Sequence, residues 1–205
     1  PAEVNTSIRP GWFFHERENE VVRSVSELYD IYLRSVGGNA TFLLNCPPDK
    51  EGQIYEKDAA VLYELGKKIQ KLKNTALLKK AVFSCSSQEV QLKLSELKRI
   101  DGKFWQSNAT DEKPWIQLSW QKEQEISTLI LQENILKSQR VENFDVYSLQ
   151  DDDEWQLETT GKTIGYKKII LLSPIRTKAI RIVFKTYRQY PTIAAINVVN
   201  EQNGV

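Results

Sequence analysis

The 205-residue sequence contains no methionine, one histidine and two cysteines. Cys46 and Cys85 lie in different segments, so they allow at most one disulfide bridge and predict no disulfide framework. We interpret them as free, buried thiols. One histidine and two scattered cysteines also provide no zinc-binding constellation. Nothing in these counts indicates a catalytic metal or another cofactor.

The sequence also has no excess of charge of one sign and no long apolar run. The 28 Lys and Arg residues nearly balance 27 Asp and Glu residues, for a formal net charge of +1. This balance argues against binding of nucleic acid through a large basic field. No apolar run approaches the ~20 residues of a transmembrane helix, and no signal peptide opens the chain. Since even a starting methionine is absent, we expect a piece of a longer protein, and the missing signal peptide then predicts no location.

The opening stretch, residues 1–15, contains several side chains of the types found in binding and catalytic sites. It holds a carboxylate, a guanidinium, the only histidine and three aromatic side chains: Glu3, Arg9, His15, Trp12, Phe13 and Phe14. Pro10 disfavours helix at Arg9, and Pro10-Gly11 is a turn signal, so the spacing predicts an irregular segment rather than a helix or an alternating strand. Such segments often carry binding and catalytic groups. The alternative is a packed surface loop in which Glu3 pairs with Arg9.

Residues 24–73 show helical spacing on both sides of a short apolar run. Ser24 and Glu27 have capping-box spacing, and Gly37-Gly38 is expected to end this helix with a left-handed glycine. Residues 40–45 are typical of a strand buried on both faces of a parallel sheet. A second helix is expected over residues 56–73. This α/β segment, at roughly 75 residues, is too short to close its own core.

From about Leu78 onward, short strand-like runs replace helical spacing. They cover residues 81–86, 115–120, 125–134, 141–149, 154–159, 167–173, 179–186 and 192–200, and Asp151-Asp152-Asp153 reads as a hairpin turn. About eight strands without intervening helices predict an antiparallel β-sandwich or jelly roll. The predicted fold class is therefore an α/β fragment followed by an all-β antiparallel jelly-roll sandwich, with domains 1–78 and 79–205.

Ordered motifs in residues 1–78 resemble a known family. They are Ser7-Ile8-Arg9-Pro10-Gly11-Trp12-Phe13-Phe14-His15, Ser35-Val36-Gly37-Gly38-Asn39 and Leu43-Leu44-Asn45-Cys46-Pro47-Pro48-Asp49 with Gly52 and Ile54. They resemble the last part of the catalytic barrel of glycoside hydrolase family 29, the α-L-fucosidases. The resemblance implies the last βα units of a TIM-like barrel, whose N-terminal part, with the nucleophilic aspartate, lies upstream of this chain.

Residues 79–205 carry a second set of motifs. They are Ile100-Asp101-Gly102 with Trp105, Trp115-Ile116-Gln117-Leu118, Gln132-Glu133-Asn134-Ile135 with Gln139-Arg140-Val141, and Thr163-Ile164-Gly165-Tyr166. They resemble a discoidin-type module, also called the coagulation factor 5/8 type C domain. Such modules are often carbohydrate-binding appendages of glycosidases.

The first resemblance implies a retaining exo-α-L-fucosidase that removes terminal α-1,3/1,4-linked fucose from glycans, secreted to the periplasm or outside a bacterial cell. Retaining enzymes pair a nucleophile with an acid/base carboxylate. The acid/base position corresponds to Glu3, with burial among aromatic rings expected to raise its pKa. Glu16, Glu18 and Glu20 are competing carboxylates. Trp12, His15, Arg9 and Asn45 are the expected substrate-binding residues, although His15 could be structural and Asn45 a turn-forming amide.

In the module, the segment Tyr187-Arg188-Gln189-Tyr190 is a candidate sugar platform; the alternative is an inert spacer. Trp115 and Trp155 match core positions of the module, and Glu133 is expected to pair with Arg140. Related modules hold calcium near Asp101, but Lys103 and Ala194-Ala195 replace residues that favour it. The competing hypothesis for the whole chain is a non-catalytic module that binds glycans or a partner.

Overall fold

The computed structural model describes residues 2–93, 96–97 and 102–201. The chain divides into two compact units, Pro1–Lys73 and Asn74–Val205, and each is described by itself. A four-residue helix, α3 (Ala76–Lys79), belongs to the second unit and was not expected from the sequence. The domain boundary that we predicted between residues 78 and 79 falls inside this helix.

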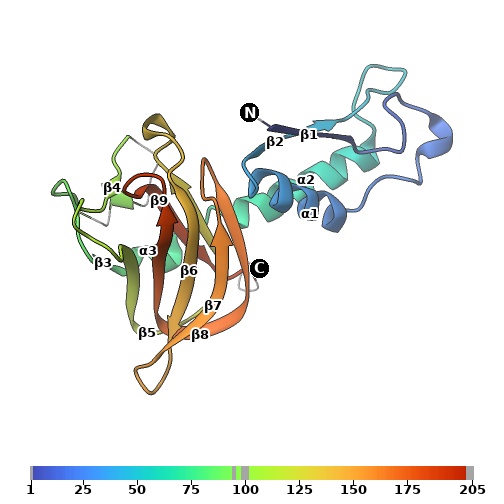
Figure 1. Cartoon of the computed structure of the whole chain (residues 1–205). Helices are drawn as coiled ribbons and strands as arrows, with labels where there is room; N and C mark the ends of the chain where they lie inside the picture. Colours follow the sequence, from blue (N-terminus) through green and yellow to red (C-terminus); the bar gives the residue numbers. More distant parts are fainter. Residues whose placement is uncertain (1, 94–95, 98–101, 202–205) are drawn as a thin grey trace. The chain divides into compact units, whose positions relative to one another are not determined.

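The first unit has the order strand, helix, strand, helix. Its elements are β1 (Ala2–Ser7), a short 3-10 helix η1 (Glu16–Glu18), α1 (Val25–Val36), β2 (Ala40–Asn45) and α2 (Glu56–Lys71). β1 and β2 pair in parallel, from Ala2 opposite Ala40 to Ser7 opposite Asn45. Both helices lie on the same side of this strand pair (Figure 1). The predicted helices and the predicted parallel strand are confirmed.

Two expectations for the strands of this unit were wrong. Ala2–Ser7 forms a strand, not an irregular segment, because Pro10 restricts only the residue before it and leaves these six residues free to pair with β2. β2 is also not buried on both faces, since Leu43 is 48% exposed. Among the described residues β2 pairs with β1 alone.

The sequence predicted the N-terminal cap of α1 correctly, but not the conformation at its C-terminal end. The backbone N–H of Glu27 donates to the Ser24 hydroxyl at 3.1 Å, as the capping box predicted. At the other end Gly37 keeps a right-handed conformation (φ −72°), and Asn39 takes the left-handed one (φ 70°). Gly38 is needed for a different reason: a Cβ there would lie 2.5 Å from the Arg34 carbonyl oxygen.

The second unit is an antiparallel β structure. Its strands are β3 (Val82–Cys85), β4 (Trp105–Gln106), β5 (Trp115–Glu133), β6 (Val141–Leu149), β7 (Trp155–Lys162), β8 (Lys168–Tyr187) and β9 (Thr192–Val199), with a 3-10 helix η3 (Ile135–Lys137) after β5. The strand order is β4-β9-β5-β8-β6-β7, and β3 pairs with β5 (Figure 1). The predicted β-sandwich is confirmed at this level.

The predicted strand list was too finely divided. Residues 115–120 and 125–134 belong to one strand, β5, and residues 167–173 and 179–186 belong to β8. The pairing of β5 with β8 shifts register between Ser119 and Gln124. Irregularities of this kind bend strands, and they interrupt the alternation that marks a strand in the sequence. β4 was missed because it has only two residues.

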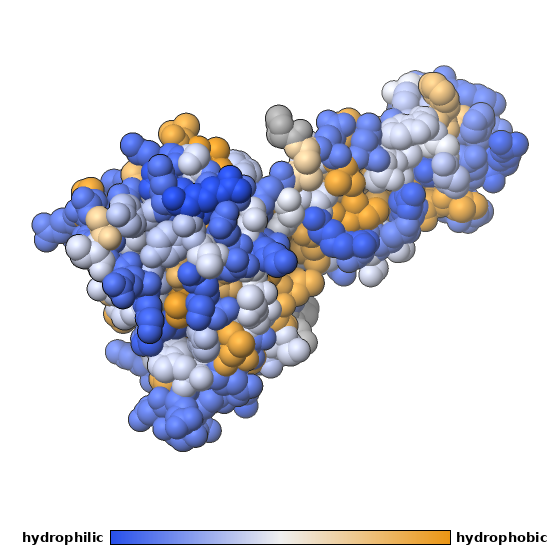
Figure 2. Space-filling model, viewed as in Figure 1, coloured by the Kyte–Doolittle hydropathy of each residue, from blue (hydrophilic) through white to orange (hydrophobic). Residues whose placement is uncertain are grey.

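Along the strands of the sandwich, side chains that face the core alternate with side chains that face outward. In β8, Ile180, Ile182 and Phe184 are at most 1% exposed, and Lys185 faces solvent, as the sequence indicated. The predicted turn between β6 and β7 is also present, with the Asp153 N–H donating to the Gln150 carbonyl at 3.1 Å. This hairpin forms the hydrophilic lower tip of the sandwich in Figure 2. No helix in the described part of the chain is long and apolar enough to cross a membrane.

Candidate functional site

The carboxyl ends of β1 and β2 hold the loop formed by residues 8–14, called the 8–14 loop below. The strands end side by side at Ser7 and Asn45. The Asn45 side-chain amide donates to the Ser7 hydroxyl and to the Trp12 carbonyl, both at 3.0 Å. The Ser7 hydroxyl in turn donates to the Gly11 carbonyl at 2.7 Å. The loop is therefore attached to both strand ends by side-chain hydrogen bonds.

Arg9 fixes the same loop from within. Its side chain is fully buried, and its Nε donates to Asp58 Oδ2 at 2.7 Å, with Asp58 also at 0% exposure. Its Nη1 donates to Asn19 Oδ1 at 3.1 Å. The guanidinium carbon lies 4.5 Å from the ring centroid of Phe14 and 5.2 Å from that of Tyr55. A buried charge needs an opposite charge and hydrogen bonds to compensate it, and Asp58 provides that charge for Arg9.

This geometry rules out the alternative in which Glu3 pairs with Arg9. Arg9 pairs with Asp58, in the first turn of α2, and Glu3 is exposed. The expectation that aromatic walls bury Glu3 is also wrong for this chain, because Trp12 is itself 52% exposed. Asp58 was not identifiable from the sequence, since an acidic residue in the first turn of a helix is ordinarily a surface residue that interacts with the helix dipole.

The structure brings Arg9, Trp12, His15 and Asn45 together around the 8–14 loop, but not Glu3. The Arg9 Nη1 reaches the His15 carbonyl at 3.5 Å, and the His15 side chain is exposed. Glu3 precedes Ser7 by four residues, which at ~3.3 Å per residue is roughly 13 Å along the strand. Glu3 also lies on the sheet face away from α1, because its neighbour Val4 lines a hollow with α1 residues.

The competing carboxylates differ from one another. Glu16 pairs with Lys50 and Glu20 with Lys57, both on the surface, as expected for a solvated connector. Glu18 is half-buried, and its Oε2 is enclosed without a hydrogen-bond partner among the described residues. A Cβ on Gly11 would lie 3.7 Å from this oxygen. Besides Asp58, Glu18 thus places a carboxylate next to the 8–14 loop.

A second candidate site lies between loops of the sandwich. A hollow of about 420 Å³ is lined by Gln106, Arg140, Tyr187, Arg188, Gln189 and Tyr190, and is called the Arg140 groove below. It contains all four residues of the predicted sugar platform. Arg140 Nη1 donates to the Tyr190 carbonyl at 2.9 Å and to Gln106 Oε1 at 3.3 Å. Arg140 was not predicted as a groove residue, because it is distant from the platform in sequence.

Glu133 supports this groove from beneath. Its carboxylate accepts backbone N–H groups of Arg140 at 2.7 Å, Val141 at 2.9 Å and Gly165 at 2.6 Å. The expected Glu133–Arg140 pair is thus made through the Arg140 backbone, while the guanidinium binds groove carbonyls. Burial raises the pKa of Glu133, against the opposing effect of these hydrogen bonds and of the Arg140 charge.

Trp115 and Trp155 are not core residues, contrary to the prediction. They are half-buried on the outer face of the sheet, and the Arg181 guanidinium carbon lies 4.6 Å and 4.1 Å from their ring centroids. Trp105 and Trp120 are the buried indoles, at 1% and 5% exposure. The reason is alternation: Ile116 is fully buried, so Trp115 must face outward.

Two remaining predictions concern single residues. Cys46 and Cys85 are both free, as expected, and half-buried rather than buried. Burial raises the pKa of each thiol. Asp101, the candidate calcium ligand, lies outside the described residues.

Similarity to known fucosidases extends over both units. The α-L-fucosidase 1 of Arabidopsis thaliana is 30% identical over 205 residues, which cover 97% of this chain and 40% of that protein. A GH29 fucosidase of Ruminococcus gnavus, solved in complex with fucose, superposes with a TM-score of 0.82 at 28% identity and covers 97% of this chain and 41% of that one. The chain thus spans about 40% of the length of its curated relatives.

The sandwich alone has further relatives. A family 32 carbohydrate-binding module of Clostridium perfringens NanJ, solved with galactose, covers 62% of this chain and 98% of that one at a TM-score of 0.52 and 18% identity, which shows a shared fold. Residues 82–198 match the model of the F5/8 type C domain. This match spans β3 to β9 of the antiparallel unit described above, and the chain therefore belongs to the F5/8 type C domain family.

Proposed function

We propose that this chain is the C-terminal part of a retaining exo-α-L-fucosidase that removes α-1,3/1,4-linked fucose from glycans. The observation that carries the proposal is that similarity to fucosidases covers 97% of the chain, and so extends through the first unit as well as the sandwich. In this proposal residues 1–78 supply the last βα units of a TIM-like barrel, and residues 79–205 form a jelly-roll module. The protein acts in the periplasm or outside the cell.

The first unit has the features that such a role needs. Barrel enzymes bind substrate at the carboxyl ends of their parallel strands. Here that end carries the 8–14 loop, with the exposed Trp12 ring, the exposed His15 and the Asn45 amide. Aromatic rings and polar side chains of this kind fit a sugar, which has apolar ring faces and hydroxyl edges. Arg9 then supports the loop from behind, since its side chain is fully buried.

The acid/base role of Glu3 is the finer part of the proposal. Its support is the family resemblance, together with its position on the sheet face away from α1. In the full-length protein, Glu3→Ala should lower kcat/KM on fucosyl oligosaccharides, whose leaving groups need protonation, by about 10²-fold or more. Activated aryl α-L-fucosides need no proton, so their turnover should fall far less, and azide should partly restore it.

Two controls accompany this test. The 205-residue chain alone should not turn over aryl fucosides, because we propose that the nucleophile lies outside it. Glu18→Ala is the matched carboxylate variant, since Glu18 lies beside the 8–14 loop. If Glu18→Ala shows the leaving-group dependence and Glu3→Ala does not, the acid/base role moves to Glu18. Absence of α-fucosidase activity in the full-length protein would contradict the proposed function itself.

A second candidate function, glycan binding by the sandwich, is favoured by the Arg140 groove. It combines two tyrosines, two guanidinium groups and two amides in one hollow. Because the groove is open and small, we expect a Kd for fucose, galactose or fucosylated glycans no tighter than about 0.1 mM. Titration followed by NMR should show this affinity in the 205-residue chain, and Tyr190→Ala should weaken it severalfold.

Tyr166→Ala is the matched control, because Tyr166 is also exposed on the sandwich, at 60%, and does not line the groove. Equal weakening in both variants would place the sugar elsewhere. The absence of any binding at millimolar sugar would leave the sandwich as a spacer.

A further inference from the structure

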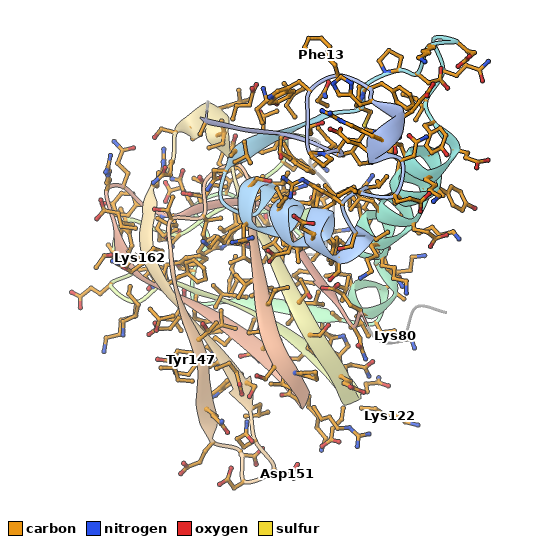
Figure 3. All side chains as sticks on the ribbon, turned by 90° about the vertical axis from the view of Figure 1, so that its right-hand side faces the viewer. Phe13, Lys80, Lys122, Tyr147, Asp151 and Lys162 are labelled. Atoms are coloured by element: carbon orange, nitrogen blue, oxygen red, sulfur yellow. The ribbon has the colours of Figure 1, made fainter. Side chains whose placement is uncertain are left out.

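The 8–14 loop presents an aromatic ring that the proposed chemistry does not use. Phe13 is 78% exposed, more than any other aromatic side chain among the described residues. Figure 3 shows it pointing away from the ribbon at the tip of the loop. A single exposed apolar side chain is common on protein surfaces; what distinguishes this ring is the anchored loop at the candidate site that presents it.

The ring is exposed although the loop around it is firmly held. On one side of Phe13, the Trp12 carbonyl accepts the Asn45 amide at 3.0 Å. On the other side, Phe14 packs against the buried Arg9 guanidinium at 4.5 Å and against the Tyr55 ring at 5.9 Å. The backbone before and after Phe13 is therefore anchored, and the ring is presented outward by this anchoring.

The position of the ring selects its ligand. The floor at this strand end is polar, with the Ser7 hydroxyl hydrogen-bonded to the Asn45 amide at 3.0 Å. If a terminal fucose binds this polar floor, a ring that points away from the ribbon meets what continues outward from the fucose (Figure 3). What continues outward from such a fucose is the rest of the glycan. The apolar face of a pyranose ring stacks on an aromatic side chain, which buries area on both partners.

We propose that Phe13 is a specificity-determining residue that stacks on a sugar of the glycan other than the fucose, on the leaving-group side. This inference rests on the proposed fucosidase function. It predicts that Phe13 contributes to kcat/KM only when the substrate has a second sugar. Phe13 touches no reacting atom, so its contribution should be the same for a good and a poor leaving group of equal size.

The test uses the full-length protein and two substrates: a branched fucosyl oligosaccharide and an aryl α-L-fucoside without a second sugar. Phe13→Ala should lower kcat/KM on the oligosaccharide about tenfold, and change it less than about twofold on the aryl fucoside. Tyr63→Ala is the control, because Tyr63 is an exposed aromatic on α2 at 65% and should change neither value. Thermal unfolding of each variant checks that the fold is kept.

Two further variants separate stacking from packing against protein. Phe13→Tyr keeps the ring and should retain the oligosaccharide activity, whereas Phe13→Leu keeps apolar volume without a ring and should not. Restoration by Leu, or an equal loss on both substrates with Phe13→Ala, would show that Phe13 packs against another part of the protein and would overturn the inference. A wild-type enzyme that cleaves neither substrate would contradict the proposed function instead.

Discussion

Asp58→Ala should destabilise the first unit by about 3–5 kcal/mol, because it leaves the Arg9 guanidinium buried without its counter-charge. Both side chains are fully buried, so water cannot replace the lost carboxylate. The cost is a large share of the 5–15 kcal/mol that typically separates folded from unfolded domains. The 8–14 loop should loosen first, since Arg9 supports it through Asn19 and Phe14 as well.

Hydrogen exchange of peptides from residues 8–23 and 56–71 measures this loss, with peptides of the sandwich as the internal reference. Asp30→Ala is the matched control: Asp30 also pairs with an arginine, Arg34, but on the surface of α1 with both side chains more than half exposed. An exposed pair at this helical spacing contributes only about 0.3–0.5 kcal/mol. Similar protection losses in the two variants would mean that the buried pair does not hold the loop.

The Arg9–Asp58 pair also marks the limit of what the sequence could predict. Helical and strand periodicities located α1, β2 and α2, because each depends on neighbours within a few residues. The partner of Arg9 is 49 positions away, and several acidic residues satisfied the same charge requirement. Glu3, the alternative partner, lies near Arg9 along the chain. Only the structure shows that Arg9 is buried against Asp58 while Glu3 is exposed on β1.

In the sandwich, sequence motifs predicted the family but not the roles of individual aromatic residues. Trp115 belongs to a matching motif, yet its ring stacks with Arg181 on the outer face. The alternation with Ile116 was visible in the sequence, but it does not say which face is the core until the long strands β5 and β8 are paired. The Arg140 groove was found in part: its platform residues are contiguous, whereas Gln106 lies in β4 and Arg140 precedes β6.

Glu133→Ala should destabilise the sandwich by at least about 3 kcal/mol, because three backbone N–H groups lose their acceptor at once. The Val141 and Gly165 donors are buried, so little water is available to replace the carboxylate. Urea unfolding followed by tryptophan fluorescence reports the loss, since Trp105 and Trp120 lie in this core. Glu123→Ala, at an exposed position of the same strand, should change stability by less than about 0.5 kcal/mol.

A sharper test of the same residue compares how the stability of wild type and of Glu133→Gln depends on pH. Because burial raises the pKa of Glu133 above 4.5, the folded state binds its proton more tightly than the unfolded chain does. The stability contributed by this titration is fully present below pH 4.5 and is lost as pH rises through the higher folded pKa. Wild type should therefore gain stability relative to Glu133→Gln as pH falls toward 4.5. A difference that stays constant, or that shrinks on acidification, would mean that the three N–H donors outweigh burial and hold the pKa down.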